Sequence, residues 1–290
     1  MSTLSRHHPV IGRTGLFPAP DPIPIFAPRR ILKEPVTPPP IDAPPRRLRQ
    51  MHDALAAAYG PQRWWPAATP FEVVLGAYLT QNTAWNAVVR SLSQLRAAGF
   101  LSLDGLRALP LDELQRLIRP SGFATRKAAA LQAFVAMLDE EFNGSLERMA
   151  ASPTESLRPR LLALPGVGPE TADAILLYAL GHPVPVADEY LRRIAERHRL
   201  LDPPPQRNRR GYDALTELTR AAFAFDADAE KTRLYNEFHA LAVAVGKAHC
   251  GRSPRCLNCP LAADLARMQC SSRSSSLPVL TGRNGPEIET

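Results

Sequence analysis

The chain has 290 residues, which allows one large domain or two modest ones, and 45% of them are hydrophobic, enough to bury a core. Its formal charge of +7 and its isoelectric point near 9.6 favour a polyanionic partner, nucleic acid above all. No stretch approaches the ~18 uninterrupted apolar residues of a membrane helix, and the proline-broken N-terminus lacks the apolar core of a secretory signal, so we expect a cytoplasmic protein with no membrane partner.

The two ends of the chain differ in composition from the part between them. Residues 1–45 carry twelve of the 30 prolines. Such a segment cannot build helices or a packed core, so we predict a disordered, proline-rich extension. Residues 272–290 include a run of serines, and we predict a disordered tail there as well.

Between these ends the pattern is helical. Apolar residues recur at three- and four-residue spacing, proline and glycine stand at the junctions, and no strong alternating run indicates a strand. The pattern therefore predicts an all-α protein. The expected helices cover residues 48–59, 71–79, 87–95, 111–118, 125–142, 159–164, 169–180, 188–198, 212–224 and 230–245.

A glycine-rich connector over residues 164–169 separates two of these helices. Gly166 and Gly168 permit positive φ and the close approach of another backbone, and Pro169 suits the first position of the next helix. The backbone amides of Gly166, Val167 and Gly168 would then stand bare beside a helix N-terminus, which is a ready site for an anion. The alternative is an ordinary connector between two helices.

Four ordered motifs carry a family resemblance, three of them in the helical part of the chain and the fourth in its cysteines. The run from Leu164 to Tyr178 resembles the helix-hairpin-helix of the endonuclease III superfamily of DNA glycosylases, and Asp188 stands at the spacing of that family's catalytic aspartate. The segment from Leu79 to Thr83 resembles the one whose glutamine, here Gln81, enters the gap left by the extruded base. The resemblance implies a base excision repair enzyme that binds damaged double-stranded DNA as a monomer, with the hairpin amides on a phosphate.

Cleavage of an N-glycosidic bond develops positive charge on the sugar, and a nearby carboxylate can stabilise that charge or orient the attacking water. The resemblance assigns this role to Asp188. The alternative is an N-cap for the helix that begins at Glu189, because aspartate is a preferred cap. The two roles are compatible, since the cap would fix the carboxylate.

Glu170 stands where bifunctional relatives carry a lysine, two residues after the second hairpin glycine. In those relatives the amine attacks the sugar, forms an imine and leads to strand scission, which a carboxylate cannot do. The resemblance therefore places Glu170 in the catalytic site and implies no AP-lyase activity. The alternative is an acid that complements the helix dipole. None of the chain's lysines occupies that position; they are Lys33, Lys127, Lys231 and Lys247.

The segments 60–66, 119–123 and 170–176 resemble the 3-methyladenine DNA glycosylases of the superfamily. In that branch aromatic side chains line the lesion pocket, and the matching positions are Trp64, Trp65 and Trp85. Indole faces attract a flat cationic purine by stacking and cation–π contact. The alternative is that these tryptophans are core or interface anchors.

All four cysteines lie close together near the C-terminal end, at Cys250, Cys256, Cys259 and Cys270. In a cytosolic protein such a cluster favours a metal site over disulfides. It resembles the 4Fe–4S loop of endonuclease III, and zinc on four thiolates is the chemical alternative. The family's gaps are about six, two and five residues, so the longer gap before Cys270 leaves its role as fourth ligand open.

The resemblance also implies two helical domains with a DNA-binding cleft between them. Residues 68–183 form the central six-helix-type domain that contains the hairpin, and residues 46–67 join residues 184–271 in an iron–sulfur-type helical domain. The leading functional interpretation is a monofunctional glycosylase for alkylated purines. Two others stay open: a glycosylase for another lesion such as an oxidised pyrimidine, with or without weak AP-lyase activity, and a non-catalytic DNA-binding protein that uses the same hairpin.

Overall fold

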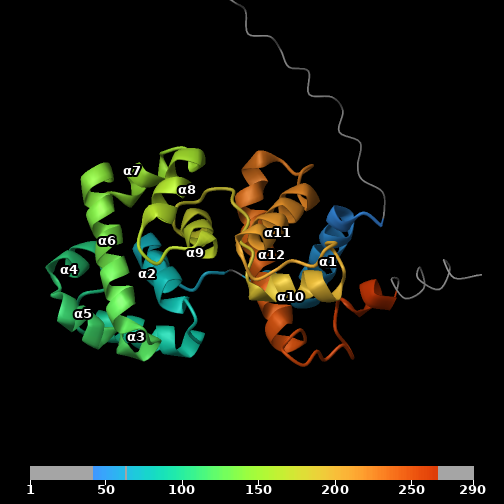
Figure 1. The fold of residues 1–290 in the computed structure, drawn as a ribbon, viewed down its shortest axis with the longest axis horizontal. Helices are drawn as coiled ribbons and strands as arrows, with labels where there is room; N and C mark the ends of the chain where they lie inside the picture. Colours follow the sequence, from blue (N-terminus) through green and yellow to red (C-terminus); the bar gives the residue numbers. More distant parts are fainter. Residues whose placement is uncertain (1–41, 63, 267–290) are drawn as a thin grey trace, which may run out of the picture. The chain divides into compact units, whose positions relative to one another are not determined.

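The computed structural model describes residues 42–62 and 64–266, and regular secondary structure in these ranges is helical throughout (Figure 1). The all-α prediction is therefore confirmed. The elements are α1 Pro44–Tyr59, α2 Pro70–Thr80, α3 Trp85–Ala97, α4 Leu103–Ala108, α5 Leu111–Leu117, the 3₁₀ turn η1 Arg119–Ser121, α6 Ala124–Phe142, α7 Leu146–Ala150, α8 Thr154–Ala163, α9 Pro169–Ala174, the π-helical turn η2 Ile175–Ala179, α10 Glu189–Arg197, α11 Arg209–Ala222 and α12 Asp228–Ala248.

Several helices begin at a side chain that satisfies an otherwise unpaired backbone amide. The Thr69 hydroxyl accepts a hydrogen bond from Glu72 N (3.1 Å) at the start of α2, and Asn208 Oδ1 accepts one from Gly211 N (3.0 Å) at the start of α11. Ser102 and Ser145 cap α4 and α7 in the same way. These short polar residues therefore fix the helix boundaries that the apolar pattern leaves imprecise.

Two predicted boundaries were wrong because proline was treated as a helix breaker. The helix predicted from residue 159 begins at Thr154 and continues through Pro159, which lies inside α8. Pro44, assigned by sequence to the N-terminal extension, is the first residue of α1. Proline is tolerated in the first turn because the amide it lacks has no partner there.

The predicted helix over residues 169–180 is also interrupted. It runs as α9 to Ala174 and then widens into the π-helical turn η2, which ends at Ala179. A π-helical turn inserts one extra residue per turn and shifts the face that the following side chains present. The short helices α4 and α7 were not predicted, because six and five residues are too few for a periodic pattern to stand out.

The helix α2 lies at the centre of the first group of helices. It is almost entirely buried from Phe71 to Leu79 and packs against α3, α6 and η2. The longer α6 crosses beside it and also contacts α4, α5 and α7 (Figure 1). This packing holds the C-terminal end of α2, and the turn that follows it, beside the start of α9.

The helix α1 packs far from its neighbours in sequence. It lies against α11 and α12, while α10 packs on α12 (Figure 1). The Arg47 guanidinium on α1 makes two hydrogen bonds to the Asp264 carboxylate, at 3.0 and 2.7 Å, and His198 Nδ1 lies 2.8 Å from the same carboxylate. A buried charged network therefore joins the first described helix to the last described residues.

The described residues all fall within one compact unit, so the division into domains at residues 68 and 184 stays a prediction. The predicted disordered extension, apart from residues 42–45, and the predicted tail lie outside the described residues. None of the helices described is long and apolar enough to span a membrane.

Candidate active site

A pocket of about 970 Å³ opens among the turn after α2, the hairpin before α9, and helices α10 and α12. Gln81, Glu170 and Asp188 all line it, together with Trp64, Trp65 and Trp85. The structure therefore gathers residues from four separate sequence motifs around one cavity. Its volume lies in the range of pockets that bind small organic ligands.

The hairpin forms a tight turn at Gly166, which adopts φ +74°. Gly168 was expected to share this freedom, but its backbone is extended, with φ −94° and ψ 175°. A side chain placed at Gly168 would meet no atom within 4 Å, so the space outside it is open to another molecule. Pro169 occupies the first turn of α9, as predicted.

The last turn of α9 is anchored within the protein by Asp173, whose side chain is fully buried. Arg158 donates two hydrogen bonds to its carboxylate, at 2.7 and 2.9 Å, and the Tyr212 hydroxyl donates a third at 2.8 Å. The charge of Asp173 is thus satisfied, as a buried carboxylate requires. This anchor fixes the orientation of the helix that carries Glu170.

Gln81 ends α2 and rests on the hairpin. Its Nε2 donates to the carbonyl of Gly166 (3.1 Å) and to the Thr171 hydroxyl (3.0 Å). The family resemblance places both Gln81 and the hairpin at the DNA. The structure shows that the two are in direct contact.

Asp188 is the N-cap of α10. Its Oδ1 accepts a hydrogen bond from Leu191 N (2.8 Å), which leaves Oδ2 on the side of His239. The predicted capping geometry is therefore confirmed. The cap holds the carboxylate at the pocket in one orientation while only 8% of the residue is exposed.

Glu170 lies on the first turn of α9 and opens into the same pocket. Its surface is exposed to solvent at the pocket, although protein atoms surround the carboxyl densely. This desolvation, followed by the charge of Asp188, raises the pKa of Glu170 to about 7 against a smaller opposing effect of His239. Two carboxyl groups, Asp188 and Glu170, thus share one cavity, and Glu170 can keep its proton near neutral pH.

The three tryptophans form a cluster on one wall. The Trp64 and Trp85 rings are 6.2 Å apart between centroids, and the Trp65 and Trp85 rings are 5.5 Å apart. Lys247 on α12 places its Nζ 5.6 Å from the centroid of the Trp64 ring. The tryptophans are half-buried and line the pocket, so they can both pack and present ring surface to a ligand.

Sequence reasoning missed two pocket residues, His239 and Lys247, which both lie on α12. His239 on α12 places Nε2 3.6 Å from Asp188 Oδ2, and its Nδ1 lies 2.6 Å from the Tyr178 hydroxyl. Lys247 lies two turns further along α12 and is also part of the lining. The sequence shows each only as one member of a helical pattern, with no motif to mark it.

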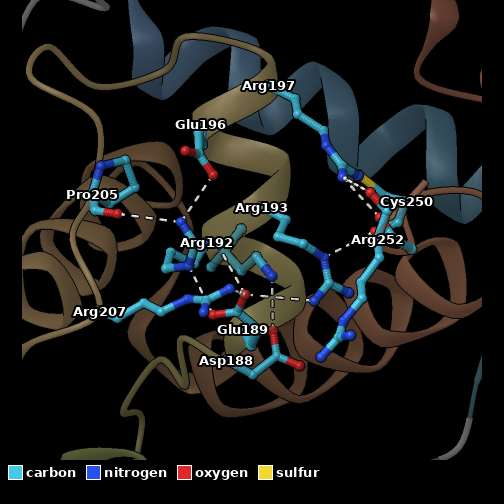
Figure 2. Close-up of polar contacts among 12 residues, drawn as sticks. Asp188, Glu189, Arg192, Arg193, Glu196, Arg197, Pro205, Arg207, Cys250 and Arg252 are labelled. Atoms are coloured by element: carbon cyan, nitrogen blue, oxygen red, sulfur yellow. Dashed lines mark hydrogen bonds and ion pairs between the residues drawn. The ribbon is translucent and has the colours of Figure 1, made fainter. Parts of the chain in front are cut away.

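Arginines of α10 hold the cysteine-containing loop (Figure 2). Arg193 donates to the carbonyl of Cys250 (3.0 Å), and Arg197 lies 2.9 Å from its Sγ. Arg197 also donates to the carbonyls of Gly251 (2.8 Å) and Arg252 (3.0 Å). The helix capped by Asp188 is therefore tied directly to this loop.

Three of the four predicted metal ligands lie in the described part of the chain. Cys250 is buried, Cys259 half-buried and Cys256 exposed. Burial raises the pKa of the Cys259 thiol, with smaller contributions from Cys256 and Cys250. This all-thiol donor set fits an iron–sulfur cluster or zinc. Within residues 42–62 and 64–266 no three potential ligands are arranged to hold a metal, and Cys270 lies outside these ranges.

Comparisons with known proteins agree with the motifs. A profile of the family described as HhH-GPD superfamily base excision DNA repair protein matches residues 75–215. The chain is 36% identical, over 216 residues, to an inferred DNA repair glycosylase of Methanocaldococcus jannaschii; the match covers 74% of this chain and 93% of that protein.

Solved structures show the same fold. The H. pylori 3-methyladenine DNA glycosylase MagIII bound to 1,N6-ethenoadenine has a TM-score of 0.60 and 28% identity, covering 71% of this chain and 98% of that one. A trapped endonuclease III–DNA covalent intermediate also has a TM-score of 0.60, with 23% identity over 77% of this chain and 98% of that one. The predicted superfamily resemblance is confirmed, and the chain belongs to the HhH-GPD superfamily of base excision DNA repair proteins.

Proposed function

We propose that this DNA glycosylase is monofunctional and hydrolyses the N-glycosidic bond of alkylated purines in double-stranded DNA, acting as a monomer. The observation that carries the proposal is the pairing of Asp188 and Glu170 in one tryptophan-lined pocket. A carboxylate stabilises the positive charge that develops on the sugar, and aromatic side chains stack on a flat base. The hairpin amides are the proposed contact with a backbone phosphate.

Asp188 is the proposed group that stabilises the charge on the sugar. One of its oxygens is occupied by the amide of Leu191, so the other can face the sugar or the attacking water. Glu170, with a pKa of about 7, holds a proton in part of the molecules at neutral pH and can pass it to a departing base. A neutral adduct needs such a proton more than a cationic one, which is already a good leaving group.

The proposed preference for alkylated purines is supported by the tryptophan cluster and by a relative. Stacking between aromatic rings selects a base by its flat surface. The similar H. pylori enzyme is a 3-methyladenine DNA glycosylase, and its structure holds an alkylated purine, 1,N6-ethenoadenine.

The absence of AP-lyase activity is proposed from Glu170. A second candidate, a glycosylase with lyase activity, is favoured by one observation, because Lys247 lines the pocket. Its amine lies over the Trp64 ring and on a different helix from Glu170. Among the lysines that the structure describes, Lys127 lies outside the pocket lining and Lys231 pairs with Asp228 (2.7 Å), so Lys247 is the amine to test.

Duplexes that carry a single 3-methyladenine-type base, 1,N6-ethenoadenine or an oxidised pyrimidine test the proposal. We expect strand breaks at the alkylated purines only after alkali, and a loss of activity of about 100-fold in Asp188→Asn. Breaks without alkali, or an adduct trapped by borohydride, would contradict the monofunctional claim. Loss of that adduct in Lys247→Met would then identify the lyase amine.

We also propose that Cys250, Cys256, Cys259 and Cys270 hold a 4Fe–4S cluster, with zinc as the alternative. The cluster would fix the loop that α10 grips through Arg193 and Arg197. Iron, sulfide and zinc analysis of protein purified without oxygen distinguishes the two, together with absorbance at about 400 nm, which is typical of iron–sulfur proteins. The variant Cys270→Ser tests the fourth ligand: full metal content in this variant would exclude it.

A further inference from the structure

The turn that carries Gln81 is held from beneath by a buried lysine. Lys127, on the first turn of α6, is only 4% exposed. Its Nζ donates to the carbonyls of Leu79 (2.8 Å) and Ser121 (2.8 Å) and to the hydroxyl of Thr83 (2.7 Å). An ammonium group has three N–H donors, and all three are used here.

The acceptors lie on both sides of Gln81. Leu79 precedes it by two residues and Thr83 follows it by two. The Thr83 hydroxyl is also 3.0 Å from the carbonyl of Gln81 and 2.7 Å from that of Ser121. Between them Asn82 adopts φ +50°, a left-handed conformation that is uncommon for residues other than glycine. The backbone of the turn is therefore fixed at both ends around a strained residue.

The side chain of Gln81 is held less firmly than its backbone. Its two hydrogen bonds, to Gly166 and Thr171, join it to the hairpin and must break before the side chain can enter DNA. These are bonds between neutral groups, whereas the bonds of Lys127 are charge-assisted and stronger. The side chain can thus leave the hairpin while the backbone of the turn stays in place.

We propose that Lys127 is a positioning residue for DNA insertion: it stiffens the turn from Leu79 to Thr83, so that Gln81 can be driven into the base stack. The inference rests on the proposed role of Gln81. Opening a base stack costs a few kcal/mol. A flexible turn would change its own backbone conformation before Gln81 displaced the base. Burial lowers the pKa of Lys127 to about 8, so at neutral pH most molecules keep the third proton that the third acceptor needs. Lys127 does not line the pocket, which separates this role from a nucleophile.

The variant Lys127→Met tests the inference, because methionine keeps the apolar stem and removes the ammonium. The probe is a duplex with a tetrahydrofuran abasic analogue beside 2-aminopurine, whose fluorescence reports insertion. We expect the insertion equilibrium to fall at least tenfold, with affinity for undamaged duplex changed less than twofold. The matched control is Leu131→Ala, one turn further along α6 and 1% exposed, which lowers stability but removes no hydrogen bond to the turn.

A second pair of variants keeps the test independent of the fold of Lys127→Met. Thr83→Val removes the hydroxyl at constant shape and should lose insertion, whereas Thr83→Ser should retain it. Normal insertion in Lys127→Met, or an equal loss in Leu131→Ala at equal stability, overturns the inference alone. A wild-type signal that Gln81→Ala leaves unchanged overturns the role of Gln81, and the inference with it.

Discussion

The Glu170 carboxyl shares the pocket with Asp188, and this proximity gives the site a proton that can be tested by pH. With a pKa of about 7, Glu170 should pass its proton to a neutral base such as 1,N6-ethenoadenine most effectively below that pH. We expect the wild-type rate on that base to fall as pH rises through about 7. Glu170→Gln should lose this dependence and be on the order of 100-fold slower below pH 7.

Stability gives an independent check on the same group. The folded-state pKa of Glu170 is raised from 4.5 to about 7, so its contribution to stability is full below pH 4.5 and is lost as pH rises through 7. Between pH 5 and pH 8 the wild type should therefore lose about 1 kcal/mol of free energy of unfolding that Glu170→Gln does not lose, after allowance for solvent screening. Equal changes in denaturant midpoint for both proteins at the two pH values would contradict the shift.

His239 offers a second prediction at this scale. When the Tyr178 hydroxyl donates to Nδ1, the ring carries its proton on Nε2, which faces Asp188 at 3.6 Å. The imidazole would then orient the carboxylate, as an aspartate and histidine do in other sites. We expect His239→Leu to lower kcat about tenfold with little change in affinity for abasic-analogue DNA.

Two further variants separate orientation from packing at His239. His239→Gln keeps a donor near the position of Nε2 and should recover most of the activity. Tyr178→Phe frees the choice of tautomer and should have an intermediate effect. If His239→Gln and His239→Leu lose activity equally, the ring acts by filling space and not by directing a proton.

At the scale of elements, substitutions at two glycines test the packing of the fold and the contact with DNA separately. A side chain at Gly246 of α12 would lie 2.1 Å from the Tyr190 ring of α10, whereas one at Gly168 of the hairpin would meet nothing. Gly246→Ala should lower the free energy of unfolding by about 1–3 kcal/mol, as overpacking does. Gly168→Ala should leave stability within about 0.5 kcal/mol and weaken DNA binding, because the added methyl group enters the space left for a phosphate.

Chemical denaturation and DNA titration of both variants decide this prediction. Each variant is the other's control, since both change glycine to alanine. Equal destabilisation by the two changes would mean that the α10–α12 contact is not the constraint. Unchanged DNA affinity in Gly168→Ala would remove the hairpin from the proposed interface.

The elements also show what the sequence could and could not predict. Local signals were sufficient for the hairpin and for the Asp188 cap, because each depends on residues close in sequence. The position of Lys127 under the Gln81 turn depends on contacts 44 and 48 residues apart, which no local pattern encodes. The same holds for His239, which meets Tyr178 across 61 residues. The predicted start of α8 at Pro159 was wrong because proline weakens a helix but does not always interrupt it.

At the scale of the whole molecule, one carboxylate joins the two ends of the described chain. Asp264 is 3% exposed and is bound by Arg47 of α1 and by His198, which follows α10. These partners outweigh the burial of the carboxyl and lower the pKa of Asp264 to about 2. Its contribution to stability is therefore present above its unfolded pKa of 3.8 and is lost as pH falls through 2.

Asp264→Asn should consequently lower the free energy of unfolding by about 3 kcal/mol at pH 7, because it removes the buried negative charge that Arg47 and His198 face. The difference from wild type should shrink as pH falls from 4 towards 2, where the wild-type carboxyl also becomes neutral. Asp104→Asn is the matched control: it removes a carboxylate that also pairs with an arginine, Arg107, but whose side chain is 90% exposed, so stability should change by less than about 1 kcal/mol. Denaturant unfolding of the three proteins at pH 7 and pH 3 measures both effects. Equal losses in the two variants would mean that burial of the Asp264 pair adds nothing to the attachment of α1.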